Sequence, residues 1–275
     1  MADPTPPSAD QDDPFTRGTG IATHSRVEVV GSGPIRVLAA HGWTTDARVF
    51  APWIPYLDGS RFTVAFVEAR GYGAARELAG EHSIPEYGED LLRVAADLGW
   101  DEFSLVGHSM GGKAIQYALT LAPRQVKSLV GVTPVPASGS PMPDEVIALF
   151  RAAVTESDSR RRIFDMSTGH RYDDAWLDEQ IAASMVASGP EANRSYLDSW
   201  TDGNFADRVA GIDVPVLVVV GTHDGGITAA SSQETWGPLY PNLTIAEIDG
   251  AGHYPIGETP AEFAAIVGDF LGAHG

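Results

Sequence analysis

One serine of the 275-residue chain stands in a pattern that suits nucleophilic chemistry. Ser109 occupies the centre of Gly107-His108-Ser109-Met110-Gly111, with a short apolar run before it and a helical pattern after it. A serine hydroxyl is a weak nucleophile unless a base removes its proton and a fixed geometry presents its oxygen. The flanking glycines would let a strand and a helix meet at a sharp turn. We therefore predict a nucleophilic Ser109, the alternative being a serine that only caps the following helix.

Two further side chains could complete this chemistry. His253 precedes the last helical pattern and follows a late strand-like run, so its loop could bring a general base to Ser109. Asp224 comes shortly after a valine-rich run, at the end of a strand that would face the nucleophile. A carboxylate there would hold the imidazole in the required tautomer and stabilise the imidazolium. Asp213 lies at the wrong end of the same run, and Asp249 is a weaker competitor.

The elements that must position these residues follow a regular alternation. Short apolar runs, typical of strands buried on both faces, alternate with amphipathic helical patterns. This alternation predicts an α/β fold with a mostly parallel, doubly wound sheet, helices on both faces, and a ligand site beyond the carboxyl ends of the strands. The predicted strands are Pro34–Ala40, Phe62–Val67, Phe103–Val106, Val126–Val132, Pro215–Val220 and Leu243–Ile248, and the predicted helices are Ile84–Leu98, one from about Ala229 and one over about Pro260–Leu271.

The alternation is interrupted between residues 137 and 208. Three amphipathic segments occur there without a strand-like run, separated by glycine and proline breaks. We predict a helical cap over residues 137–208 and an α/β core made of residues 21–136 and 209–275. Residues 1–20 are rich in Pro and Asp and are predicted to form a disordered tail. The three helical segments of the cap are Asp144–Val154, Asp174–Val186 and Glu191–Trp200.

The order of these motifs resembles the α/β-hydrolase superfamily from about Arg26 to Leu271. His41-Gly42-Trp43 resembles its oxyanion loop, and the turn at Ser109 resembles its nucleophile elbow. The loops that hold Asp224 and His253 follow in the family's order of serine, acid and base. The resemblance implies the α/β-hydrolase fold with the cap inserted after the sixth strand. It favours the branch of serine esterases and cofactor-free haloperoxidases.

The resemblance also implies further site residues. The backbone N–H groups of Trp43 and Met110 would stabilise the oxyanion of a tetrahedral intermediate. The substrate pocket would contain His41, Trp43, His108 and Tyr254. Ordinary core packing is the alternative for Trp43 and Met110, and packing within the elbow is the alternative for His108.

One stretch departs from the family pattern. Many relatives carry a serine after an Arg-Gly-x-Gly sequence, whereas this chain has alanines in Glu68-Ala69-Arg70-Gly71-Tyr72-Gly73-Ala74-Ala75. We expect this difference to alter the loop and not the catalytic residues. Two other histidines are poor bases, because His41 belongs to the oxyanion loop and His223 immediately precedes the better acid.

Several reactions of this fold use the same three residues. We favour a serine hydrolase, of carboxylesterase or lactonase type, that cleaves a small or medium-sized, largely apolar ester or lactone through an acyl-enzyme. A cap rich in Ile, Leu, Met and Trp would cover such an apolar pocket. The alternatives are a carbon–carbon bond hydrolase or perhydrolase and a non-catalytic receptor for a small ligand. A haloalkane dehalogenase is excluded, because it would need Asp in place of Ser109.

Composition limits the partners. A net charge of -19, from 18 basic and 37 acidic residues, argues against nucleic acid and anionic membranes as partners. The chain has no cysteine, which removes disulfides, thiolate metal sites and cysteine nucleophiles. No metal-binding pattern stands out, so we expect neither metal nor cofactor. A small-molecule substrate is the expected partner, with monomer and homodimer both open. The first twenty residues do not resemble a secretory signal, which makes the cytoplasm the default expectation.

Overall fold

The computed structural model describes residues 26–275, so the predicted disordered tail lies outside the described residues. Seven strands form one sheet in the order β1-β3-β2-β4-β5-β6-β7. Strand β1 runs antiparallel to β3, and all other neighbours are parallel. The mostly parallel α/β sheet is therefore confirmed, with β1 as an additional edge strand. The strands are β1 (Arg26–Gly31), β2 (Ile35–Ala40), β3 (Phe62–Glu68), β4 (Phe103–His108), β5 (Val126–Val132), β6 (Val216–Gly221) and β7 (Leu243–Ile248).

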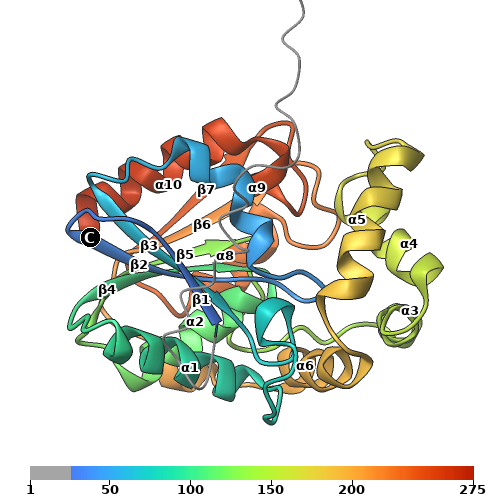
Figure 1. Ribbon diagram of the computed structural model, residues 1–275, viewed down its shortest axis with the longest axis horizontal. Coiled ribbons are helices and arrows are strands. Elements are labelled where there is room, and N and C mark those ends of the chain that lie inside the picture. Colours follow the sequence, from blue (N-terminus) through green and yellow to red (C-terminus); the bar gives the residue numbers. More distant parts are fainter. Residues whose placement is uncertain (1–25) are drawn as a thin grey trace, which may run out of the picture.

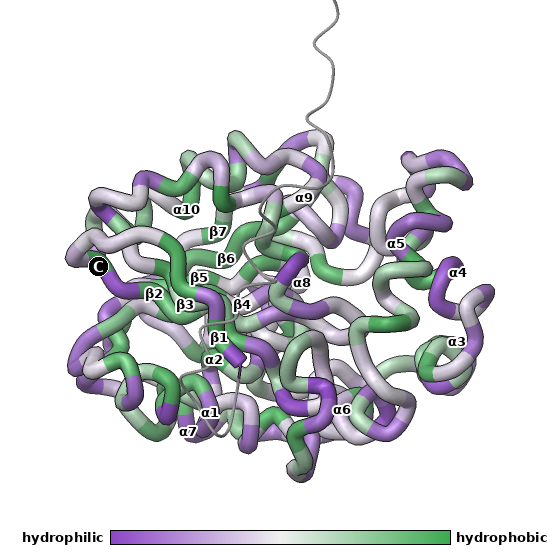
Figure 2. The backbone as a smooth tube through the Cα atoms, in the orientation of Figure 1, coloured by the Kyte–Doolittle hydropathy of each residue, from purple (hydrophilic) through white to green (hydrophobic). Residues whose placement is uncertain are grey.

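Helices cover both faces of this sheet (Figure 1). Helices α1 (Ile84–Asp97), α2 (Met110–Leu121) and α8 (Ala229–Trp236) pack on one face. The 3-10 helix η2 (Ala47–Tyr56) and α10 (Pro260–His274) pack on the other. Successive residues of the central strands β2 to β6 enter opposite cores, which explains why these strands are largely apolar (Figure 2). The short elements η3 (Gly73–Ala75) and α9 (Pro255–Glu258) lie in loops.

A group of helices separates β5 from β6 and stands beyond the ends of the parallel strands, on the right of Figure 1. We call α3 to α6 the inserted helices. They follow the fifth strand of the described chain, not a sixth, because only β1 to β5 precede them. The helices of this segment are α3 (Asp144–Ala153), α4 (Ser157–Ser167), α5 (Asp174–Ala187), α6 (Pro190–Asp202) and the short α7 (Ala206–Val209).

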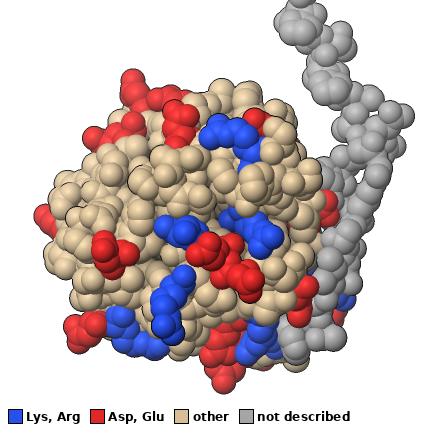
Figure 3. Space-filling model, turned by 90° about the vertical axis from the view of Figure 1, so that its left-hand side faces the viewer, with Lys and Arg blue, Asp and Glu red and all other residues tan. Residues whose placement is uncertain are grey.

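The opposite end of the molecule carries acidic and basic side chains side by side (Figure 3). Positive charge is thus not gathered into a continuous surface on that face. Within residues 26–275, no helix is both long enough and apolar enough to cross a membrane.

Candidate active site

Ser109 lies on the turn between β4 and α2 in a strained backbone conformation. Its φ of 52° falls in the left-handed region, which costs a non-glycine residue about 1–3 kcal/mol. Backbone hydrogen bonds hold the turn: Ser109 donates to the carbonyl of Val132 at 2.9 Å and accepts from the N–H of Val135 at 3.0 Å. Its neighbours on both sides are buried, whereas Ser109 is partly exposed. The fold therefore enforces an unfavourable conformation that keeps this serine accessible.

The two glycines of the motif are required by close approach, as predicted. A Cβ atom on Gly107 would lie 2.4 Å from the carbonyl oxygen of Gly111. A Cβ on Gly111 would lie 2.2 Å from the carbonyl oxygen of Ala40, at the end of β2. The Ser109 side chain makes no capping hydrogen bond to α2. A role as a simple helix cap therefore does not account for this residue.

The structure brings together the predicted base and acid. His253 Nδ1 lies 2.7 Å from Asp224 Oδ2. The other carboxylate oxygen of Asp224 accepts from the N–H groups of Gly226 at 2.8 Å and Ile227 at 3.1 Å. The Asp224 carboxylate is buried, while 15% of the His253 side chain is exposed. Because a carboxylate only accepts, His253 donates through Nδ1 and can take a proton at Nε2.

The competing acids have other partners. Asp249 accepts from the Thr222 hydroxyl at 3.2 Å, and Asp213 accepts from the Asn242 amide at 2.6 Å. Among the three carboxylates considered from sequence, Asp224 is thus the one bonded to His253.

The backbone of His253 is tied to the nucleophile turn. Its carbonyl accepts from His108 Nε2 at 3.0 Å and from the Thr133 hydroxyl at 2.9 Å. Burial lowers the pKa of His108 to about 3, so this ring is neutral and donates through Nε2–H. Thr133 follows β5 and has a φ of 40°, which is strained for a β-branched residue. Thr133 was not predicted from the sequence, because its hydrogen bond to the His253 carbonyl joins segments that are 120 residues apart.

The loop after β2 passes directly against Ser109. A Cβ on Gly42 would lie 3.1 Å from Ser109 Cβ. Residue Trp43 follows on this loop, and Met110 begins α2, where the first N–H groups of a helix have no partner within it. Two backbone donors from these positions could therefore act on an oxygen bound near Ser109.

His41 fixes this loop. Its Nδ1–H donates to the carbonyl of Gly42 at 2.9 Å, and its Nε2 accepts from the N–H of Ala69 at 3.1 Å. Burial lowers its pKa to about 4, so the ring is neutral at physiological pH. Burial, with a smaller contribution from Asp46, raises the pKa of the adjacent Glu68 to about 8. The buried side chains of His41 and Glu68 therefore support the loop after β2.

A cavity of about 190 Å³ lies between this loop and the inserted helices α4 and α5. Tyr254, next to His253, lines it and stacks on Phe164 with 5.2 Å between the ring centres. Of the four predicted pocket residues, only Tyr254 is among the lining residues, because His41 and His108 are buried behind the loops and Trp43 stacks on Phe150. The lining mixes polar with apolar side chains: Thr44, Thr45, Asp46, Arg48, Val49, Phe164, Gln180, Ala183, Ser184, Ala187 and Tyr254.

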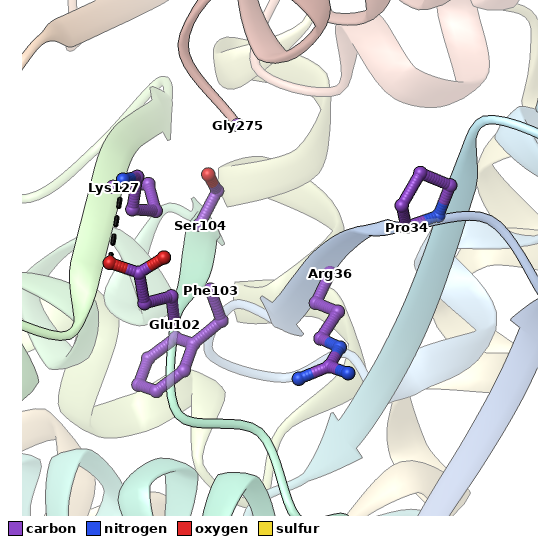
Figure 4. A pocket seen from close by; sticks show the side chains of 7 residues that line it. All are labelled: Pro34, Arg36, Glu102, Phe103, Ser104, Lys127 and Gly275. Atoms are coloured by element: carbon purple, nitrogen blue, oxygen red, sulfur yellow. Dashed lines mark ion pairs between the residues drawn. The ribbon is translucent and has the colours of Figure 1, made fainter.

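A second cavity, of about 290 Å³, lies at the opposite end of the sheet, where β2, β4 and β5 begin (Figure 4). Arg36, Ser104 and an ion pair between Lys127 and Glu102 contribute its polar groups. Ligands of open α/β sheets bind beyond the carboxyl ends of the strands, so this cavity is not part of the candidate site. Within residues 26–275, no group of three or more potential ligands is arranged to hold a metal ion.

Comparison with known proteins shows the family of the chain. The model of the alpha/beta hydrolase family matches residues 37–266. The chain is 25% identical over 233 residues to a non-heme haloperoxidase from Rhodococcus erythropolis, covering 79% of this chain and 85% of the relative. It is 27% identical over 253 residues to 2-(acetamidomethylene)succinate hydrolase from Mesorhizobium japonicum, covering 88% and 90%.

A solved hydrolase structure, olei00960 from Oleispira antarctica, has the same fold. Its TM-score is 0.80 at 18% identity, over 92% of this chain and 96% of that one. The family match spans most of the chain and includes the positions of Ser109, Asp224 and His253. This protein belongs to the alpha/beta hydrolase family.

Proposed function

We propose that this protein is a serine hydrolase that cleaves a small or medium-sized carboxylic ester or lactone through an acyl-enzyme. The observation that carries this proposal is the buried Asp224 carboxylate on His253 Nδ1, together with a strained, accessible Ser109. His253 lies in the loop of residues 249–254 between β7 and α9, which we call the base loop. Its carbonyl is hydrogen-bonded to His108, the residue before Ser109, which holds the base loop against the nucleophile turn.

In this mechanism the Ser109 Oγ attacks the substrate carbonyl carbon while its proton passes to His253 Nε2. The resulting oxyanion accepts from the N–H groups of Trp43 and Met110. The carbon–oxygen bond to the leaving group then breaks, and His253 returns the proton to the alcohol. Water attacks the acyl-enzyme with the same base, which releases the acid and restores Ser109. With a lactone, the alcohol remains attached to the acyl chain.

We infer that the cavity lined by Tyr254 receives part of the substrate, because Tyr254 is next to His253. Its volume of about 190 Å³ is below the range of about 300–1,000 Å³ that is usual for drug-sized ligands. The side that follows β2 is mostly polar, whereas α4 and α5 contribute apolar side chains together with Gln180 and Ser184. A short acyl or alcohol group fits such a cavity better than a long alkyl chain, and the polar wall can bind an oxygen-rich part of the substrate. This lining favours a substrate that is less uniformly apolar than the composition of the inserted segment suggests.

Two alternatives would use the same residues. A carbon–carbon bond hydrolase or a perhydrolase is the first, and the relative named as a non-heme haloperoxidase supports the perhydrolase. A non-catalytic receptor for a small ligand is the second.

A panel of substrates distinguishes these functions. Purified protein is given p-nitrophenyl acetate, p-nitrophenyl octanoate, a γ-lactone, a vinylogous diketone, and acetate with hydrogen peroxide. We expect steady turnover of the acetate ester or the lactone that exceeds turnover of the octanoate and is lost in Ser109→Ala. Turnover of the diketone or formation of peracetate alone would replace the ester assignment. A burst without turnover would favour the receptor, and no difference from Ser109→Ala would refute the hydrolase.

A further inference from the structure

A buried carboxylate outside the proposed catalytic residues organises the loop of the base. Glu258, on α9, accepts from the N–H of Gly252 at 2.9 Å and from the N–H of Tyr254 at 2.8 Å. These are the residues on either side of His253. Only 1% of the Glu258 side chain is exposed. One carboxylate thus fixes the backbone before and after the base, and neither hydrogen bond belongs to a regular helix or strand.

The inserted segment supplies further contacts of this loop. The N–H of His253 donates to the carbonyl of Ser167, the last residue of α4, at 2.9 Å. Arg171, between α4 and α5, forms an ion pair with Glu258 and donates to the carbonyl of Gly250 at 2.5 Å. The Arg171 Nε also donates to the carbonyl of Thr168 at 3.0 Å. The same guanidinium therefore binds the end of α4, the base loop and the carboxylate that organises it.

Close packing supports the same link. A Cβ on Gly252 would lie 2.7 Å from the carbonyl oxygen of Ser167 and 2.8 Å from Thr168 Cα. The rings of Tyr254 and Phe164 are nearly parallel, with an angle of 12° between their planes. The base loop is consequently enclosed by the core, through the His253 carbonyl, and by the end of α4, through the His253 N–H.

We propose that Arg171 and Glu258 are positioning residues that couple the inserted helices to His253. The seating of α4 on the base loop sets the orientation of the imidazole, so the arrangement of the inserted helices controls proton transfer as well as access to the cavity. This inference rests on the proposed function, because it assigns Arg171 and Glu258 a role in the orientation of its base.

The test compares Arg171→Gln with a matched control. Arg161→Gln removes an arginine of similar exposure that pairs with Asp174 and Asp178 within the inserted helices and does not touch the base loop. We expect Arg171→Gln to lower kcat by about 10- to 100-fold with KM changed less than about threefold, because small displacements of a catalytic group have costs of this size. Arg171→Lys should recover part of the kcat, and Arg161→Gln should stay within about twofold of wild type.

A second measurement does not depend on turnover. The low-field proton resonance of the His253–Asp224 hydrogen bond, assigned by its loss in Asp224→Asn, should broaden or shift in Arg171→Gln and Glu258→Gln well below their melting temperatures. It should be unchanged in Arg161→Gln. The inference is overturned if the wild type is active and Arg171→Gln lowers kcat no more than Arg161→Gln does. It is also overturned if the resonance in Arg171→Gln and Glu258→Gln is the same as in the wild type. Absence of activity in the wild type would instead refute the proposed function, and the resonance would still decide the coupling.

Discussion

In the proposed mechanism, Asp224 acts on Ser109 through the imidazole of His253. In Asp224→Asn the side chain keeps its shape but loses its charge, and its amide can donate to Nδ1, which would place the proton on the wrong nitrogen of His253. We expect kcat to fall by about 10⁴-fold, the size of the effect when a triad acid is changed in this way. Steady-state kinetics on p-nitrophenyl acetate measures it. Asp249→Asn is the control and should stay near wild type, and the reverse order would assign the acid to Asp249.

The residues proposed to react stand out in the sequence, whereas those that hold them do not. Ser109, Asp224 and His253 each stand in a short local pattern at the end of a predicted strand. Thr133 contacts the His253 carbonyl across 120 residues, and the carboxylate of Glu258 binds the backbone of Gly252 and Tyr254. Such contacts depend on the folded path of the loops and leave no periodic signal. The burial of His41 and His108 has the same origin, because burial of a side chain behind a loop is not visible in sequence.

At the level of elements, the turn between β4 and α2 tolerates no additional atoms. Gly111→Ala would place a methyl group against the backbone of β2, so we expect a loss of stability of about 1–3 kcal/mol or more. Gly268→Ala in α10 is the matched control, because no other atom lies within 4 Å of its new Cβ. The free energy of unfolding of Gly268→Ala should rise by about 0.5–1 kcal/mol, because alanine has the higher helix propensity. Urea unfolding of both variants checks this, and equal effects would contradict the packing argument.

The elements that sequence missed have identifiable reasons. Helix α4 contains three consecutive arginines and a strongly polar composition, so its apolar stripe is short. The 3-10 helix η2 contains Pro52 and Pro55, which argue against an ordinary helix. Strand β1 lies at the sheet edge, and its inner face is only partly buried. The strongly apolar strands and the long helices α1 and α10 were predicted within a few residues, because burial on both faces or a regular stripe is plain in their sequences.

For the whole molecule, Glu68 makes stability depend on pH. Its pKa rises from 4.5 to about 8 on folding, mainly through burial, so the folded state holds a proton that the unfolded state releases. This contribution is complete below pH 4.5 and is lost as the pH rises toward 8, at about 1.4 kcal/mol per pH unit.

Glu68→Gln removes the titrating group. Its free energy of unfolding, measured in urea, should therefore rise relative to wild type between about pH 5 and about pH 8. The exposed Glu77→Gln is the control and should show no such trend. A difference between Glu68→Gln and wild type that is constant with pH would mean that Glu68 ionises normally in the folded protein.

The proposed function of the molecule depends on one covalent bond between Ser109 and an acyl group. The most direct measurement is intact-mass and peptide mass spectrometry of Asp224→Asn after mixing with p-nitrophenyl acetate, because slow deacylation should let the intermediate accumulate. We predict an added acetyl group on the peptide that contains Ser109. The double variant Ser109→Ala/Asp224→Asn should carry none. An acetyl group at any other residue, or turnover by wild type with no acylated Ser109 at any time, would contradict the mechanism.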